Sequence, residues 1–185
     1  AKILIDTGSR ILVETPTYLG ALQAFTPMEP EVVSVASDDD GVDVDDLTAK
    51  VGSGSARARF LYVLPNFHNP AGTTLPEARR NRAVELASHY GVPILEDDPY
   101  GQLRYEGEHQ PPLVEIDSEY HGERSGKAAA GGRFRGGVIY LSSLSKTLAP
   151  GLRIAWVVAP TDVIGRLVQI KQGADLHTST FNQMV

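Results

Sequence analysis

Short apolar runs alternate along this chain with longer stretches in which apolar residues recur at helical spacing. The runs predict strands, and several are continuously apolar, which is typical of strands covered on both faces. They are residues 10–14, 31–35, 60–64, 93–96, 138–142 and 154–159. The helical stretches are residues 18–25, 43–51, 76–90 and 162–175. This alternation predicts an α/β fold, a mostly parallel sheet flanked by helices, with ligands at the carboxyl ends of the strands.

The stretch 76–90 has the clearest helix boundaries. Thr74-Leu75-Pro76-Glu77 has the pattern of a capping box with proline in the first turn, and Gly91 stands where a left-handed C-terminal residue is expected. Four residues at helical spacing are predicted to face the sheet: Ala83, Leu86, Ala87 and Tyr90.

Residues 119–137 break the alternation. They contain Gly122, Gly126, Gly131, Gly132, Gly136 and Gly137 and show no usable periodicity. We expect a flexible glycine-rich insertion on the surface, in which the basic side chains are solvated.

Composition narrows the function classes. The 185 residues are 42% hydrophobic and 22% charged, as in an ordinary globular protein, and the net charge of −6 argues against a general nucleic-acid-binding surface. Without cysteine the chain has no disulfide, thiolate metal site or cysteine nucleophile, which fits a reducing, cytoplasmic location. No apolar run approaches membrane-spanning length, and no signal segment opens the chain.

Polar residues follow three of the predicted strands. After residues 60–64 comes a Pro- and Gly-rich loop that contains Asn69, and after residues 138–142 a hydroxyl-rich segment carries Lys146 and Arg153. The strand 93–96 runs into Glu96-Asp97-Asp98-Pro99-Tyr100-Gly101, where three adjacent carboxylates are costly to bury without a cation. A metal ion there is an open alternative, but no histidine stands at a supporting spacing, and an organic cation is favoured.

Together the strand ends supply an amine, a carboxylate, a phenol, an amide, hydroxyls and a guanidinium. Pyridoxal phosphate needs such a set: a lysine for its aldehyde, an acid for its ring nitrogen, donors for its phenolate oxygen, and hydroxyls with an arginine for its phosphate. Each residue alone also fits a structural role, such as a solvated turn lysine or an Asn-Pro turn. The combination predicts pyridoxal 5'-phosphate as the cofactor.

Residues 65–72, 96–101 and 143–153 resemble the signature segments of fold-type I pyridoxal-phosphate-dependent aminotransferases of class I/II. The chain is most similar to the 2-aminoadipate and kynurenine aminotransferase branch, which includes the aminotransferase domains of MocR-type regulators. The resemblance runs from Lys2 to Gln183. It implies transfer of an amino group between an amino acid and a 2-oxo acid.

The resemblance also implies catalytic roles. Lys146 would bind the cofactor aldehyde and then carry the proton once substrate replaces it. Asp97 would pair with the ring nitrogen, with Glu96 and Asp98 in support. Tyr100 would donate to the phenolate oxygen.

The remaining matched positions would hold the cofactor. Asn69 would share the phenolate oxygen with the tyrosine, and Tyr18 would stack on the ring. Ser143, Ser145 and Arg153 would bind the phosphate.

In the family, further parts of the site lie outside segments like this one. An upstream loop supplies much of the phosphate site, and a C-terminal small domain supplies the arginine that binds the substrate carboxylate. We therefore expect residues 1–185 to be an incomplete large domain, without the N-terminal segment and the small domain, from a protein that forms a homodimer. Ser142 stands where relatives usually have glycine.

Three alternatives to an aminotransferase stay open. One is the cofactor- or amino-acid-sensing domain of a MocR-type transcription regulator, in which a separate domain binds DNA. A second is a lyase or synthase of the same fold. The last is a non-catalytic α/β domain. None of them makes this segment itself a nucleic-acid-binding or membrane protein.

Overall fold

The computed structural model describes residues 1–53, 57–125 and 136–184, which form a sheet of seven strands in the order β3-β2-β1-β4-β5-β6-β7. The strands are β1 (Arg10–Thr15), β2 (Glu31–Asp38), β3 (Gly41–Val42), β4 (Leu61–Val63), β5 (Ile94–Asp97), β6 (Val138–Ser143) and β7 (Ala155–Val158). The five inner strands run parallel, and β3 and β7 are antiparallel at the two edges. The prediction of a mostly parallel α/β sheet is confirmed.

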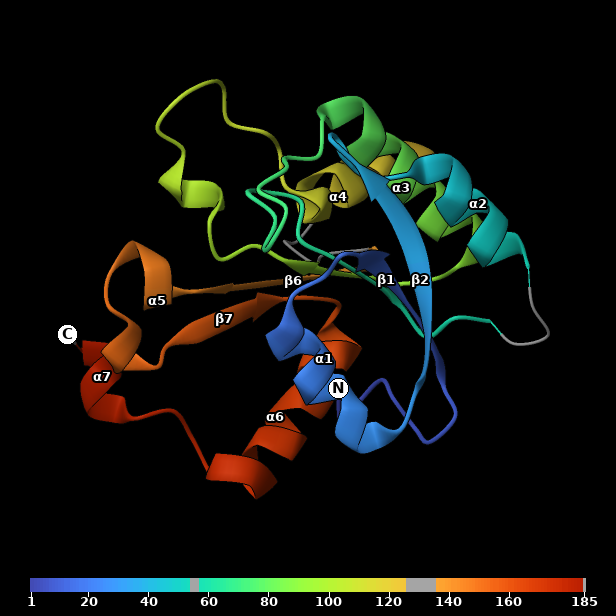
Figure 1. The fold of residues 1–185 in the computed structure, drawn as a ribbon. Helices are drawn as coiled ribbons and strands as arrows, with labels where there is room; N and C mark the ends of the chain where they lie inside the picture. Colours follow the sequence, from blue (N-terminus) through green and yellow to red (C-terminus); the bar gives the residue numbers. More distant parts are fainter. Residues whose placement is uncertain (54–56, 126–135, 185) are drawn as a thin grey trace.

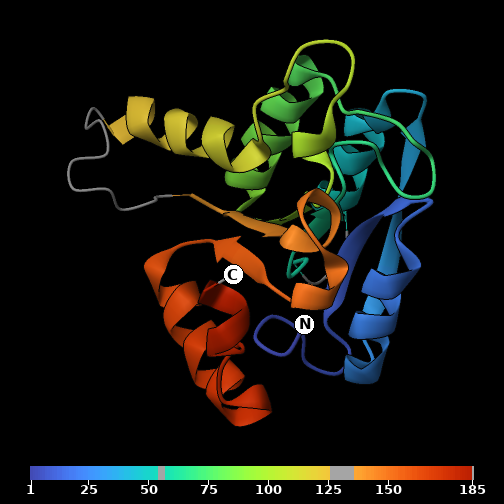
Figure 2. The ribbon, with the colours of Figure 1, turned by 90° about the vertical axis from the view of Figure 1, so that its left-hand side faces the viewer.

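Helices cover both faces of the sheet (Figures 1 and 2). They are α1 (Leu19–Phe25), α2 (Val44–Gly52), α3 (Glu77–Tyr90), α4 (Leu113–Ser125), α5 (Leu144–Thr147), α6 (Thr161–Asp175) and α7 (Thr180–Met184). Helices α2, α3 and α4 pack on one face, and α1 and α6 pack on the other. Within the described residues, no helix has the length and apolar character needed to cross a membrane.

All six predicted strands and all four predicted helices are present, with shifted ends. The sequence pattern missed β3, α4, α5 and α7. The expected surface insertion is wrong for residues 119–125, because they complete α4; residues 126–135 lie outside the described residues. The helix was missed because it lacks a pronounced apolar stripe: of residues 113–122, whose burial is described, Leu113, Ile116 and Asp117 are the buried ones.

Two local predictions are also corrected. Pro76, and not Thr74, occupies the N-cap of α3, because the Thr74 hydroxyl instead accepts the N–H of Phe67 within the preceding loop, at 3.3 Å. The C-terminal prediction is confirmed, since Gly91 ends α3 with φ of 62°. The second correction is β7, predicted as a buried strand: it is an edge strand, and Trp156 and Val158 are exposed.

A buried arginine on α3 joins three chain segments. The Arg80 side chain is fully buried and makes four hydrogen bonds. Its acceptors are Leu75 O at 2.7 Å, Pro111 O at 3.0 Å, Pro65 O at 2.8 Å and Asn66 Oδ1 at 2.7 Å. One side chain therefore fixes the loop after β4, the entry to α3 and the entry to α4.

A second buried charged residue caps α4. Glu96 is fully buried, and its two carboxylate oxygens accept the N–H groups of Leu113 and Val114, at 2.9 and 3.0 Å. These N–H groups have no partner inside the helix, and the helix dipole favours negative charge there. Burial nevertheless raises the pKa of Glu96 to about 7, against the opposing effect of the two N–H bonds.

Replacement of the buried arginine should destabilise the fold strongly. In Arg80→Leu the carbonyls of Leu75 and Pro65 and the Asn66 amide lose their donor inside the core. We expect a loss of about 3–5 kcal/mol in the free energy of unfolding, measured by urea denaturation. Arg82→Ala is the matched control, because Arg82 is exposed on the same helix and should cost less than about 1 kcal/mol. Equal losses in the two variants would contradict the role given to Arg80.

The raised pKa of Glu96 predicts a pH dependence of stability. Because the folded pKa is about 7 and the ordinary value is 4.5, the folded state binds the proton more tightly than the unfolded state. This contribution is fully present below pH 4.5 and is lost as the pH rises toward 7; it amounts to on the order of 3 kcal/mol. Unfolding free energies should therefore decline more steeply over this range in the wild type than in Glu96→Gln, which has no proton to lose. Parallel pH profiles for the two proteins would refute the assignment.

Candidate active site

The predicted site residues lie at one end of the sheet, where the carboxyl ends of its parallel strands meet. Tyr18 follows β1, Asn69 follows β4, Tyr100 follows β5, and Lys146 follows β6. Arg153 comes just before β7. Because β7 runs antiparallel to β6, its start lies beside the carboxyl end of β6, at the same end of the sheet. The chain also changes direction here, since β1 lies between β2 and β4, and such switch points form ligand crevices.

The three adjacent carboxylates are separated by the alternation of the strand. Glu96 and Asp98 point toward the face of α3 and α4, where they contact Leu113 and Asn66, whereas Asp97 points to the α1 face. Arg80 lies close enough to Glu96 and Asp98 for their charges to raise its pKa, although burial lowers it more. The cation beside Glu96 and Asp98 is thus a side chain of the protein. Within the described residues no group of three or more acidic or histidine side chains is arranged to hold a metal ion.

Asp98 organises the turn that carries Tyr100. Its carboxylate accepts Asn66 Nδ2 at 3.0 Å, the Gly101 N–H at 2.9 Å and the Tyr140 hydroxyl at 3.2 Å. A Cβ atom at Gly101 would collide with both carboxylate oxygens, so only glycine fits this turn. Burial raises the pKa of Tyr140 to about 12, so this phenol stays protonated as a donor.

Ser142 adds one more bond to this turn. Its hydroxyl donates to the backbone carbonyl of Asp98 at 2.8 Å. The serine that stands at an expected glycine position therefore ties β6 to the end of β5.

Lys146 lies in the single-turn helix α5. Ser143 is the N-cap of this helix and accepts the N–H of Ser145 at 3.2 Å. Lys146 Nζ is 5.9 Å from the centroid of the Tyr100 ring, and the lysine is exposed. Its amino group makes no hydrogen bond or ion pair within the described part of the chain. The amine therefore stands free next to the phenol, at the carboxyl edge of the sheet.

Arg153 lies between α5 and β7. It follows the short 3-10 helix Pro150–Leu152, has a φ of 53°, and is exposed. Its Nη1 donates to the Pro150 carbonyl at 3.3 Å, which leaves most of its N–H groups open. The connection between β6 and β7 thus carries two serines, a lysine and an arginine, which are residue types that donate to anions.

Tyr18 and Asn69 follow two other strands, β1 and β4, at their carboxyl ends. Tyr18 is 41% exposed and its ring lies against Gly20, where a Cβ atom would collide with it. Asn69 is partly buried in a loop closed by the bond from the His68 N–H to Thr73 O, and its peptide bond to Pro70 is cis. Among the described residues neither side chain hydrogen-bonds to Lys146 or Asp97.

Three residues that shape the site were not found from the sequence: Tyr62, Asn66 and Arg80. Tyr62 is fully buried on β4, and its hydroxyl donates to Asp97 Oδ2 at 2.6 Å. Two signals could have found them. A tyrosine in an apolar strand needs a partner for its hydroxyl, and Arg80 falls on the same helical stripe as Ala83, Val84 and Ala87.

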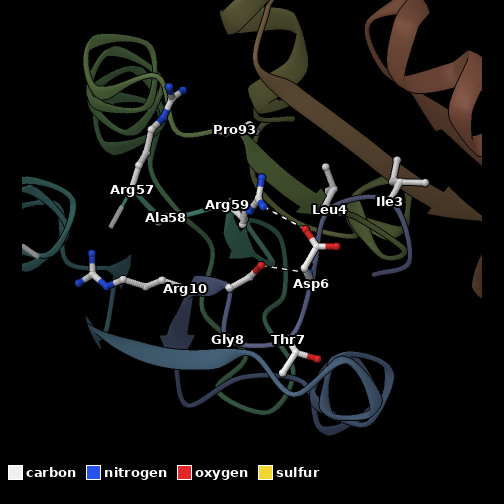
Figure 3. Close-up of a pocket in the computed structure, with 11 residues that line it drawn as sticks. Ile3, Leu4, Asp6, Thr7, Gly8, Arg10, Arg57, Ala58, Arg59 and Pro93 are labelled. Carbon is white, nitrogen blue, oxygen red and sulfur yellow. Dashed lines mark hydrogen bonds and ion pairs between the residues drawn. The ribbon is translucent and has the colours of Figure 1, made fainter. Parts of the chain in front are cut away.

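A pocket of about 640 Å³ lies at the opposite end of the sheet, around the amino ends of β1, β4 and β5 (Figure 3). It contains none of the predicted site residues. Two of its arginines already have partners: Arg59 pairs with Asp6, and Arg10 donates to the carbonyls of Lys50 and Ser53. The predicted site residues, such as Lys146, Asp97 and Tyr100, lie instead at the carboxyl ends of the strands.

Comparisons with known proteins show the family of this chain. Residues 1–183 match the family described as aminotransferase class I and II. The chain is 43% identical to aromatic-amino-acid aminotransferase 1 of Thermococcus litoralis, over 100% of this chain and 41% of that protein. It is 35% identical to the HTH-type transcriptional regulator YisV of Bacillus subtilis, over 97% of this chain and 34% of the regulator.

Solved structures give the same result. The crystal structure of LysN, an alpha-aminoadipate aminotransferase from Thermus thermophilus complexed with N-(5'-phosphopyridoxyl)-L-leucine, matches with a TM-score of 0.85 and 39% identity. The match covers 99% of this chain and 43% of that one, so the chain spans less than half the length of the aminotransferases it resembles. From the family match and the shared fold, this chain belongs to the aminotransferases of class I and II.

Proposed function

We propose that the protein containing this chain transfers an amino group between an amino acid and a 2-oxo acid, with pyridoxal 5'-phosphate as its cofactor. One observation carries the proposal. The unpaired amine of Lys146, the partly buried carboxylate of Asp97 and the donors of residues 143–153 follow the carboxyl ends of neighbouring strands, in a chain of the aminotransferase family. The chain would form part of the large domain of a cytoplasmic homodimer. Other parts of that protein would complete the phosphate site and bind the substrate carboxylate.

The residues present fit the cofactor. Asp97 Oδ2 is held by Tyr62, and no donor within the described residues reaches Oδ1, so one oxygen is left for a ring N–H. Lys146 Nζ has no competing partner there, and Arg153 donates only one weak bond, to Pro150 O. A carboxylate, an amine and a guanidinium with open valences match the ring nitrogen, aldehyde and phosphate in turn.

When bound, pyridoxal phosphate supplies the electron sink that stabilises negative charge at the substrate Cα. The proposed work of the chain is to place and protonate. Lys146 takes the proton from the substrate Cα and returns it, because its amine lies on a short, exposed helix within reach of the site. Tyr100 and Asn69 donate to the phenolate oxygen, and Asp97 keeps a negative charge beside the ring nitrogen. Tyr18 covers the ring face.

The lysine assignment is tested by covalent trapping. The full-length protein that contains this chain should take up pyridoxal phosphate with a new visible absorption band, and borohydride should then fix the cofactor on Lys146. In Lys146→Ala the label should disappear and turnover should drop about 10²–10⁴-fold. Lys171→Ala is the control, since Lys171 is paired with Asp175 on α6 and should keep both label and activity. A peptide map that places the label on another lysine would exclude the proposal.

The phosphate assignment is tested by affinity. Arg153→Ala removes a charge-assisted contact, and we expect pyridoxal phosphate to bind about 10- to 150-fold more weakly. Pyridoxal without the phosphate should bind the variant and the wild type alike. Arg166→Ala, an exposed arginine on α6, should leave both affinities unchanged. If Arg153→Ala weakened pyridoxal and pyridoxal phosphate equally, the arginine would not be a phosphate ligand.

A second candidate function is sensing in a transcription regulator. The 35% identity to a regulator over nearly the whole chain supports it. In that case the same site would bind the cofactor while a separate domain, encoded upstream, bound DNA. The reading frame upstream of residue 1 and a DNA-binding assay of the full-length protein discriminate between the two candidates.

A further inference from the structure

The carboxylate of Asp97 is held on one side only. Tyr62 donates to Oδ2 at 2.6 Å, a short bond of the kind made to a charged acceptor. Within the described residues Oδ1 has no donor. The tyrosine therefore determines which carboxylate oxygen of Asp97 has no donor at the carboxyl end of β5.

Tyr62 is itself fixed in place. Its backbone lies on the central strand β4, between Val13 of β1 and Leu95 of β5, and its side chain is 1% exposed. The Phe25 ring of α1 packs edge to face against it, with centroids 5.5 Å apart. Burial and the nearby Asp97 charge raise the pKa of Tyr62 far above its usual range, so the phenol acts only as a donor.

The surroundings make Asp97 depend on this bond. Burial raises the pKa of Asp97, Asp98 raises it further, and the Tyr62 hydroxyl is the group that lowers it. The charges of Glu14 on β1 and of Tyr18 at the start of α1 also act to keep the phenol protonated. Loss of the phenol would remove the one effect that lowers the pKa of Asp97 and would leave burial and the Asp98 charge unopposed.

We infer that Tyr62 is the positioning residue of Asp97: its hydroxyl holds Oδ2, keeps the carboxylate charged and aims Oδ1 at the ring nitrogen of the cofactor. The inference rests on the proposed function for the identity of that nitrogen. The hydrogen bond and its effect on the carboxylate do not depend on the cofactor, and they can be measured without it.

The first experiment is the titration of Asp97 in the full-length protein without cofactor, followed by NMR of ¹³C-labelled aspartate carboxyls. Tyr62→Phe keeps the ring and removes only the hydroxyl. We expect it to raise the pKa of the Asp97 carboxyl by about one to two units, the effect of losing one hydrogen bond to a charged group. Tyr140→Phe is the matched control: it removes a phenol–carboxylate bond on the other face, to Asp98, and should affect Asp97 much less. Equal shifts in the two variants, or none in Tyr62→Phe, would overturn the inference.

The second experiment uses the protein loaded with ¹⁵N-labelled pyridoxal phosphate. The ring nitrogen should be protonated at pH 8 in the wild type and less so in Tyr62→Phe, with kcat reduced about tenfold and KM little changed. A ring nitrogen equally protonated in both proteins would count against the positioning role. Failure of the proposed function would look different, because the wild type itself would then take up no cofactor.

Discussion

The geometry of the site depends on one buried charge, the guanidinium of Arg80. A buried cation is stable only when its donors are satisfied, and Arg80 meets this condition by binding Pro65 O, Leu75 O and Asn66 Oδ1. Asn66 in turn donates to Asp98, which holds the Gly101 N–H. This continuous path links the loop after β4 to the turn after β5. Those two segments, which carry Asn69 and Tyr100, cannot shift separately without leaving a buried polar group unpaired.

The same path explains how acidic residues can follow one another at the end of a central strand. Alternation sends Glu96 and Asp98 to the face that holds Arg80 and the start of α4, where N–H groups and a cation receive them. Asp97 alone points to the other face, where its one strong donor is the Tyr62 hydroxyl. Two carboxylates therefore serve the fold, and the third is the one to which the proposed function assigns the ring nitrogen. The division follows from the two-residue period of a strand and needs no special backbone.

The sequence was sufficient for what local patterns determine. Apolar runs and helical spacing located every inner strand. Because these strands run parallel, Lys146, Asp97 and Asn69 all come at the carboxyl end of the sheet. Residues whose role depends on distant partners were not found. The cap of α4 is Glu96, 17 positions before Leu113, so no local motif marks where that helix begins. Likewise no local motif distinguishes Arg80 from other helix arginines or Tyr62 from other core aromatics, because their acceptors lie 14 and 35 positions away.

The two sides of the site differ in burial and hydrogen bonding, and this difference suits the proposed chemistry. On the side of β4 and β5, Asp97 is locked by a buried phenol and Tyr100 by the Asp98 turn. On the side of β6 and β7, Lys146 and Arg153 are exposed, and α5 is a single turn. A ring acid must keep a constant distance to its partner, because its effect is electrostatic and decays with separation. A lysine that first binds the cofactor and then moves a proton must change position during each turnover. The fold thus places Asp97 on its buried central strands and Lys146 on a short, exposed helix, as the proposed chemistry requires.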